Sequence, residues 1–270
     1  MSIPYSRYIF GSLPWYGLLI VCGMIAAISL CIREEKRLGL KPDTIIDAAF
    51  WVIPFGIIGA RLYYVIFQWE MFAPNPLSIL RLWEGGLAIY GGVIGGLIAM
   101  VLFAKRRKIH PLVLTDLTVP GLALAQSIGR WGNYFNMEAY GREITNHAWQ
   151  FFPVGVQIPS ADGYTWHMAT FFYESSWNLM VFLLLWFVIR KRSKAAGTAT
   201  LWYMLLYGTG RFLIEPLRTD SLMSGSVRVS QLLAILIFIA SASALIYFFI
   251  KKPNKPLFVA AEKEIIKKKK

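Results

Sequence analysis

The sequence has few charged residues and few cysteines for its length. Charged residues make up 16% of the 270 residues, whereas hydrophobic residues make up 56%. A soluble fold of this size could not bury so much apolar surface, so a soluble globular class is excluded. Cys22 and Cys31 are too few for a disulfide-stapled scaffold, and we expect both to be small packing residues.

Several motifs of common enzyme classes are also absent. The sequence contains no Walker loop, HExxH, GxSxG or CxxC pattern. His110, His147 and His167 are far apart in the sequence, and no aspartate-rich cluster occurs. We therefore expect neither a metal nor a cofactor.

What the sequence does have is long apolar segments. Segments of about 20 apolar residues are long enough to cross the hydrocarbon core of a bilayer as helices. The expected fold class is therefore all-α: a polytopic membrane protein of about seven transmembrane helices. The seven segments are Trp15–Ile32, Ile45–Phe67, Leu87–Ala104, Leu112–Ile128, Met168–Ile189, Ala199–Ile214 and Val229–Ile250.

The net charge of +13 is distributed in a way that predicts orientation in the membrane. Basic clusters follow the first, third, fifth and seventh apolar segments. Basic loops stay in the cytoplasm, so the N-terminus is predicted outside and the C-terminus inside. We expect a transmembrane catalytic domain over residues 1–250, with a small irregular extracytoplasmic cap over about 130–167 and a basic cytoplasmic tail over 251–270. Because the charge follows topology, we expect no nucleic acid partner.

In this topology, lysine and arginine are distributed differently. All 14 lysines fall on the predicted cytoplasmic side, and the outer positions use arginine only. Guanidinium groups bind phosphate through a planar fork and keep their charge near lipid. The alternative for any single arginine is pairing with a glutamate or reaching out to the interface. The outer arginines are Arg7, Arg61, Arg81, Arg130, Arg142, Arg211, Arg218 and Arg228.

The densest polar cluster begins where the fourth apolar segment ends. Within residues 129–143 it combines arginines, asparagines and glutamates with glycines that allow tight turns. Placing ionisable groups at the depth of the lipid headgroups costs free energy, so their presence indicates a functional site. Alternatively, these residues could cap the end of the helix and fix the outer loop in position. Its members are Gly129, Arg130, Gly132, Asn133, Asn136, Glu138, Gly141, Arg142 and Glu143.

Two further segments carry candidate site residues. In the third apolar segment, glycines at four-residue spacing favour close helix packing, but they could also clear a groove beside Tyr90. In the sixth, Tyr207 and Arg211 share one helix face, where Glu215 could simply pair with Arg211. We expect Asp116 to make a folding contact. The other outer polar residues are Tyr16, Arg61, His167, Tyr173, Glu174 and Arg218.

Together these segments resemble the prolipoprotein diacylglyceryl transferase family over essentially the whole chain. The most specific match is a GRxGNxxNxE signature followed by glycine and arginine, and the segment from Tyr207 to Arg218 matches a second family block. A transporter or a transferase acting on a polyprenyl phosphate lipid are the alternatives. Transporters often have paired internal repeats, and the polyprenyl phosphate transferases often have an acidic cluster that binds a metal. The sequence contains neither feature.

The resemblance implies transfer of the diacylglyceryl group of phosphatidylglycerol to the lipobox cysteine of a prolipoprotein signal peptide, in the bacterial cytoplasmic membrane with membrane lipids around the protein. It implies that Arg130 binds the phosphate and Arg211 supports the leaving phosphate, with Tyr207 beside it. Catalytic roles are expected for Arg130, Arg211, Tyr207, Tyr90 and His167. Substrate-binding roles are expected for Arg130, Asn133, Asn136, Glu138, Gly141, Tyr16, Arg61, Glu215 and Arg218.

The sequence departs from the family pattern at two positions. Tyr90 stands where some members have a histidine that acts as a general base, and His167 lies one residue early in a block that lacks its proline. A tyrosine with an unperturbed pKa near 10 is a poor base at neutral pH. We therefore expect Tyr90 to position substrate, while His167 or the leaving phosphate assists deprotonation of the thiol.

We predict that Tyr90→Phe retains activity, because a positioning role depends on the ring more than on the hydroxyl. The measurement is the rate of diacylglyceryl transfer to a lipobox peptide. Full activity would exclude proton transfer by Tyr90, whereas loss of turnover with unchanged binding of the lipid would refute the positioning hypothesis.

Overall fold

The computed structural model describes residues 6–9, 11–161, 163–193, 195–221, 223–225 and 227–251, and most of them are helical. The α-helices are α1 (Trp15–Arg37), α2 (Thr44–Phe67), α3 (Trp69–Phe72), α4 (Ile89–Arg107), α5 (Pro111–Asn136), α6 (Thr170–Leu183), α7 (Arg190–Arg192), α8 (Thr198–Ile214) and α9 (Val229–Lys251). A π-helical turn, η4 (Leu184–Ile189), joins α6 to α7, and short 3₁₀ turns are η1 (Pro76–Leu80), η2 (Leu82–Glu84), η3 (His147–Trp149) and η5 (Glu215–Leu217).

Each of the seven predicted apolar segments coincides with a helix. Among the described residues, six helices are long and apolar enough to cross a membrane: α1, α2, α4, α5, the continuous stretch Thr170–Arg192, and α9. The remaining segment is α8, whose 17 residues extend only about 25 Å at 1.5 Å per residue. A multi-pass helical membrane protein is confirmed, and the seventh span stays a prediction. The predicted tail beyond Lys251 lies outside the described residues.

The expectation of an all-α fold with an irregular cap is wrong in one region. Strands β1 (Gly155–Ser160) and β2 (Gly163–Met168) form an antiparallel hairpin, and β3 (Met223–Ser224) pairs with β4 (Val227–Arg228). Val156 and Ile158 alternate inward from β1 and are buried. The strand β2 begins at Gly163, whose φ of +119° is a conformation that favours glycine. The helix α5 continues to Asn136, eight residues beyond the predicted end of its apolar segment at Ile128.

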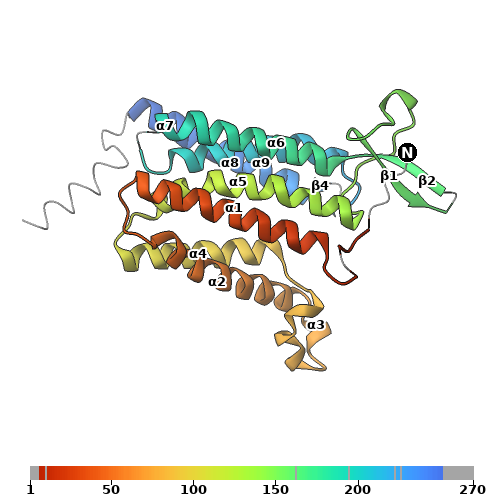
Figure 1. Ribbon diagram of the computed structural model, residues 1–270, viewed down its shortest axis with the longest axis horizontal. Coiled ribbons are helices and arrows are strands. Elements are labelled where there is room, and N and C mark those ends of the chain that lie inside the picture. The colour runs from red at the N-terminus through yellow and green to blue at the C-terminus, as the bar shows by residue number, and fades with distance from the viewer. Residues whose placement is uncertain are drawn as a thin grey trace, which may run out of the picture. The chain divides into compact units, whose positions relative to one another are not determined.

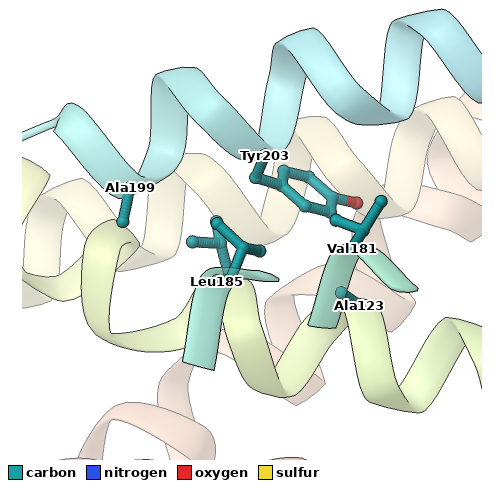
Figure 2. Close-up of a cluster of buried hydrophobic side chains, with 6 residues drawn as sticks. Ala123, Val181, Leu185, Ala199 and Tyr203 are labelled. Atoms are coloured by element: carbon teal, nitrogen blue, oxygen red, sulfur yellow. The ribbon is translucent and has the colours of Figure 1, made fainter. Parts of the chain in front are cut away.

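Two compact units make up the described chain. The first combines residues up to 30 with those from 116 onward, and the second spans residues 31–115. In the first unit α6, α8 and α9 run side by side, with the β1–β2 hairpin at one end (Figure 1). Its main core joins α5, α6, η4 and α8 through Val119, Ala123, Val181, Leu185, Ala199 and Tyr203, five of which are labelled in Figure 2.

Asp116 fixes the start of α8, as expected of a folding contact. Its buried carboxylate accepts hydrogen bonds from the backbone N–H of Gly197 at 2.8 Å and of Thr200 at 2.7 Å, and from the Thr200 hydroxyl at 2.6 Å. The first N–H groups of a helix have no partner within the helix, so a carboxylate from α5 serves as the cap of α8. This contact sets the axial position of the helix that carries Tyr207 and Arg211.

In the second unit, glycines bring α2 and α4 into backbone contact. The two helices run side by side in Figure 1. A Cβ on Gly59 would lie 2.5 Å from the carbonyl oxygen of Gly91 and 3.0 Å from the Cα of Gly95. No side chain fits between the helices here, so glycine is required at these positions. The packing interpretation of the glycine repeat is confirmed for Gly91 and Gly95.

Adjacent glycines of α4 allow a matched test of this packing. We predict that Gly91→Ala destabilises the protein by more than about 1 kcal/mol, because its Cβ would overlap the Gly59 carbonyl and the Tyr63 side chain. Gly92→Ala should be neutral or stabilising by up to about 1 kcal/mol, since its Cβ would meet only Ala60 and Gly56 atoms at 3.6 Å. Thermal unfolding in detergent measures both, and equal midpoints for the two variants would contradict the prediction.

Candidate active site

Three arginines from separate parts of the first unit converge on one carboxylate, that of Glu174 in α6. Arg130 of α5 places Nη2 2.5 Å from Glu174 Oε2. Arg218, which follows η5, places Nη1 3.0 Å from Oε1, and Arg211 of α8 places Nη1 3.3 Å from the same oxygen. The three segments meet because α5 and α8 end, and α6 begins, at the same end of the unit, beside the hairpin (Figure 1).

The Glu174 side chain is only 8% exposed. A lone buried carboxylate would be strongly destabilising, so its charge requires partners. The three guanidinium groups supply them, and in return the carboxylate holds the arginines close together despite their mutual repulsion. A site with several converging guanidinium groups is suited to bind a phosphate or another oxyanion.

Glu215 is the second buried carboxylate of this cluster. It is 0% exposed, and its Oε2 lies 2.7 Å from Arg211 Nη2, so the pairing predicted from the four-residue spacing is present. The contact is an ion pair by distance, and within the described chain neither carboxylate oxygen has a hydrogen-bond partner. The attraction between the two opposite charges at this distance holds Arg211 at Glu215 as well as at Glu174.

Arg218 is held by two carboxylates. Besides Glu174, it contacts Asp220 through Nε at 2.9 Å and Nη2 at 2.7 Å, which is bidentate geometry. Burial alone would lower the pKa of Arg218, but the hydrogen bonds and charges of Asp220 and Glu174 outweigh it and raise the pKa. Burial would likewise raise the pKa of Asp220, but Arg218 lowers it below its usual range. The pair therefore stays ionised at neutral pH.

Arg130 is the arginine with unused donors. Within the part of the chain that the structure describes, Glu174 is its only hydrogen-bond or ion-pair partner, and its side chain is 24% exposed. A guanidinium has five N–H donors, so most of those of Arg130 remain available. This residue could bind an incoming anion without breaking contacts to other parts of the protein.

The end of α5 forms a separate polar clamp. Asn133 and Asn136 both donate from Nδ2 to Glu138 Oε1, at 2.9 and 3.2 Å. Met137 and Ala139 flank the glutamate in the left-handed region, at φ 52° and 54°, which turns the chain back on itself. The predicted trio is thus brought together, and Glu138 itself is exposed. Its second carboxylate oxygen is available for a polar ligand.

Tyr16 lies against the same end of α5. A Cβ on Gly132 would be 2.6 Å from Tyr16 Cδ2, so the glycine makes room for the tyrosine ring. The neighbouring Trp15 stacks on Phe135 with ring centroids 4.8 Å apart. The predicted association of Tyr16 with the signature residues is therefore present.

Gly141 has a packing role. It forms an antiparallel bridge with Arg218, and its N–H donates to the Met168 carbonyl at 2.8 Å. A Cβ here would lie 2.8 Å from the Leu217 oxygen and 2.8 Å from Met168 Cβ. Close backbone approach therefore requires glycine, and the backbone of Arg218 is positioned through it. Contact between Gly141 and substrate stays a prediction.

His167 belongs to β2, and both of its ring nitrogens have partners. Nδ1 lies 3.0 Å from the Gly141 carbonyl oxygen, to which it can only donate. Nε2 lies 3.0 Å from the Thr165 hydroxyl, which then donates to it in the neutral tautomer. The ring also packs edge-on against Tyr140 at 4.9 Å. These contacts give His167 a structural role in the cap, and a role as a base stays a prediction.

Tyr207 is half-buried and stacks on Tyr203, with ring centroids 5.7 Å apart. It lies one turn before Arg211 on α8, as the spacing predicts. Its acid–base role stays a prediction, because the contacts that define its position are packing contacts.

Arg61 and Tyr90 belong to the second unit. Tyr90 is 39% exposed, with its ring centroid 6.3 Å from that of Tyr63. Arg61 is buried, lies 5.0 Å from the Phe72 ring centroid, and donates hydrogen bonds of 2.6–3.3 Å to five backbone carbonyls. These carbonyls belong to Ser78, Ile79, Arg81, Gly85 and Gly86. Arg61 thus fixes the loop between α2 and α4, and substrate binding by Arg61 stays a prediction.

Glu174 is the residue to which the sequence assigned no role. It was recognised as one of several outer polar residues, but nothing in its local sequence indicates that three arginines surround it. The one sequence feature that could have indicated this role is the number of predicted outer arginines, which need negatively charged partners. No group of three histidines, cysteines or acidic residues placed to hold a metal ion occurs among the described residues.

Comparison with known proteins places this arrangement in a family. The model of the prolipoprotein diacylglyceryl transferase family matches residues 7–247. The phosphatidylglycerol–prolipoprotein diacylglyceryl transferase of Streptococcus agalactiae is 41% identical over 239 residues, which cover 87% of this chain and 91% of the relative. The enzyme of the same name from Listeria innocua is 39% identical over 266 residues, which cover 96% and 94% of the two chains.

Proposed function

This chain belongs to the prolipoprotein diacylglyceryl transferase family and has its transferase activity, and from that premise we propose that the arginine cluster around Glu174 is where the reaction takes place. The proposed lipid substrate is phosphatidylglycerol, and the proposed acceptor is the lipobox cysteine of a prolipoprotein signal peptide. The observation that carries the assignment is the convergence of Arg130, Arg211 and Arg218 on one buried carboxylate.

The reaction is a displacement at a lipid carbon. The cysteine sulfur attacks the diacylglyceryl carbon that bears the phosphate ester, a C–S bond forms and the C–O bond breaks. The products are a thioether and glycerol phosphate, and the thiol proton is released. The phosphate begins as a singly charged diester and leaves as a monoester that gains a second negative charge. Cationic donors positioned at the phosphate therefore stabilise the transition state more than the bound substrate.

The contacts of each arginine support distinct roles. Arg130 binds the phosphate directly, because most of its donors have no partner in the described protein. Arg211, held between Glu174 and Glu215, faces the leaving phosphate, and Tyr207 lies one turn before it on α8. Arg218 completes the cluster, with its side chain aligned by Asp220.

The clamp at the end of α5 supports recognition of the lipid headgroup. The glycerol headgroup of phosphatidylglycerol carries hydroxyl groups, which need acceptors and donors of the kind that Glu138, Asn133 and Asn136 present together. Tyr16 lies against the same helix end and supplies an aromatic wall at Gly132. We propose that these residues orient the headgroup while Arg130 holds the phosphate.

For the thiol proton, we retain the hypothesis that Tyr90 positions substrate and that His167 or the departing phosphate assists deprotonation. The thiolate is the reactive form of cysteine, whose free pKa is about 8.5. A role for His167 as the base requires Thr165 to release Nε2, because that nitrogen otherwise accepts the threonine hydroxyl.

We further propose seven spans, with the N-terminus outside, the C-terminus inside the bacterial cytoplasmic membrane, and the site towards the extracytoplasmic face. Basic clusters follow α1, α4, α6 and α9, which supports this orientation. Within the first unit, the hairpin β1–β2 and the arginine cluster lie at the opposite helix ends from the basic residues that follow α6 and end α9.

We predict that Arg130→Ala lowers kcat/KM by about 100-fold or more, because it removes a charged donor from the reacting phosphate. The measurement uses purified protein in detergent with phosphatidylglycerol and a synthetic lipobox peptide, following glycerol phosphate release and the mass of the peptide. Arg81→Ala is the matched control, since the Arg81 side chain is exposed and its ion pair in the described structure is with the exposed Glu84. Equal losses in both variants, or no product from the folded wild type, would refute the assignment.

We predict that a cysteine replacing exposed Tyr164 in β2 reacts with a membrane-impermeant maleimide on intact cells, in a background that lacks Cys22 and Cys31. A cysteine replacing exposed Lys105 near the end of α4 should react only after the cells are opened. The reverse pattern would invert the proposed topology.

A further inference from the structure

The arginines that contact Glu174 all have carboxylate partners before any substrate binds. Arg130, Arg211 and Arg218 contact three carboxylates, those of Glu174, Glu215 and Asp220. A fourth guanidinium, that of Arg228, lies beside them and donates to the backbone carbonyls of Glu215 and Arg218. Four positive and three negative charges leave one positive charge, so net charge does not exclude a phosphate. A phosphate that binds the three arginines instead has to share their N–H donors with a carboxylate.

Glu174 is the carboxylate whose position matches that of a bound phosphate. It is the only one of the three that contacts all three arginines in the described structure, and its two oxygens accept from them much as phosphate oxygens would. Within the described structure, the carboxylate of Glu215 contacts only Arg211, and the carboxylate of Asp220 contacts only Arg218. A phosphate that binds all three arginines must therefore compete with Glu174.

The contacts also indicate which arginine exchanges its partner. If Glu174 loses its contacts, Arg211 still has its ion pair with Glu215 at 2.7 Å, and Arg218 still has its ion pair with Asp220 at 2.7 Å. Arg130 has no second carboxylate among the described residues, so its positive charge would be uncompensated. The exchange of Glu174 for phosphate is therefore most favourable at Arg130, the most exposed of the three side chains.

From these contacts we propose that Glu174 is a resident counter-anion: it holds the three arginines in place in the absence of substrate, and the substrate phosphate displaces it from Arg130. This inference rests on the proposed function for the identity of the anion, a phosphate ester. It assigns Glu174 two effects. The carboxylate keeps the arginines preorganised, and by competing for them it weakens the binding of both the lipid phosphate and the released glycerol phosphate.

A purely structural Glu174 makes the opposite prediction for anion affinity. If the carboxylate only orients the arginines, its neutralisation disorders them and weakens phosphate binding. If it competes with phosphate, neutralisation strengthens phosphate binding even where turnover falls. The sign of the change in affinity therefore separates the two roles.

The test measures binding of glycerol phosphate to the purified full-length chain in a non-ionic detergent by calorimetry. For Glu174→Gln we expect the Kd to fall about tenfold, equivalent to about 1.4 kcal/mol, because the competing charge is removed while an acceptor oxygen remains.

In the lipid arm of the experiment, the KM for phosphatidylglycerol in mixed micelles should fall as well, while kcat also falls because product release is slower. A fall in Kd for glycerol phosphate without a fall in KM would limit the exchange to the free product and overturn the substrate part of the proposal.

Glu84→Gln is the matched control. It removes the same one unit of charge, but Glu84 is 51% exposed and its ion pair in the described structure is with Arg81, which is not part of the cluster. Its charge is screened by solvent, so the Kd should change by less than about twofold. Equal tightening in both variants would show a general charge effect and overturn the proposal, as would an unchanged or higher Kd in folded Glu174→Gln.

Glu174→Asp keeps the inference testable if Glu174→Gln does not fold. This variant retains the negative charge, but the side chain is shorter by one methylene, so the carboxylate lies farther from the arginines. Because it then competes less with phosphate, the Kd should fall by a smaller factor of about two to three. No tightening in this folded variant would also overturn the proposal. Because binding is measured without the acceptor peptide, a failure of the transfer reaction itself is seen separately, as absence of the thioether product in the wild type.

Discussion

The carboxylate of Glu174 lies among guanidinium groups that come from the end of α5, the end of α8 and the segment after η5. Without it, three positive charges would face one another in a largely buried environment, and their repulsion would separate those segments. With it, one negative charge fixes the relative positions of all three. The same contacts connect the helices to the cap, because Arg218 is bridged through its backbone to Gly141, and Gly141 accepts a hydrogen bond from His167. The geometry of the site and the attachment of the cap thus depend on one ion-pair network.

The choice of arginine in this network follows from its chemistry. A lysine offers a single charged group that loses its proton readily when buried, whereas a guanidinium keeps its charge and can contact two or three acceptors in one plane. Arg218 uses both properties, since it contacts Glu174 with one nitrogen and binds Asp220 through two others. Arg61 shows the same property applied to structure, with its donors on backbone carbonyls of the loop between α2 and α4. The guanidinium group therefore serves two purposes in this chain: in Arg218 it contacts carboxylates, and in Arg61 it organises backbone.

The sequence predicts the helices well because apolar length is a local property. All seven apolar segments form helices, and the close glycine packing of α2 on α4 follows from a four-residue repeat. The Arg211–Glu215 pair is equally local. The β1–β2 hairpin was missed because Pro159 lies within β1, and a proline inside a short segment argues against a strand. The role of Glu174 depends on arginines that are 37 to 44 positions away in the chain, and the role of Arg61 depends on carbonyls that have no sequence signature. Partners that are determined by tertiary structure could not be predicted from local patterns.

A resident counter-anion has a consequence for catalysis that a set of unpaired arginines would not have. Arginines without a competing carboxylate would bind the phosphodiester and the released monoester tightly, and tight binding of the substrate does not by itself accelerate the chemical step. A carboxylate that competes for the same donors weakens the ground-state complex.

As the C–O bond breaks, however, the phosphate gains its second charge and becomes the stronger competitor for Arg130 and Arg211. The arginines are then used most fully in the transition state, where their stabilisation increases the rate. After departure of the product, Glu174 pairs with Arg130 again, so that release of a doubly charged product does not leave this arginine without a counter-charge.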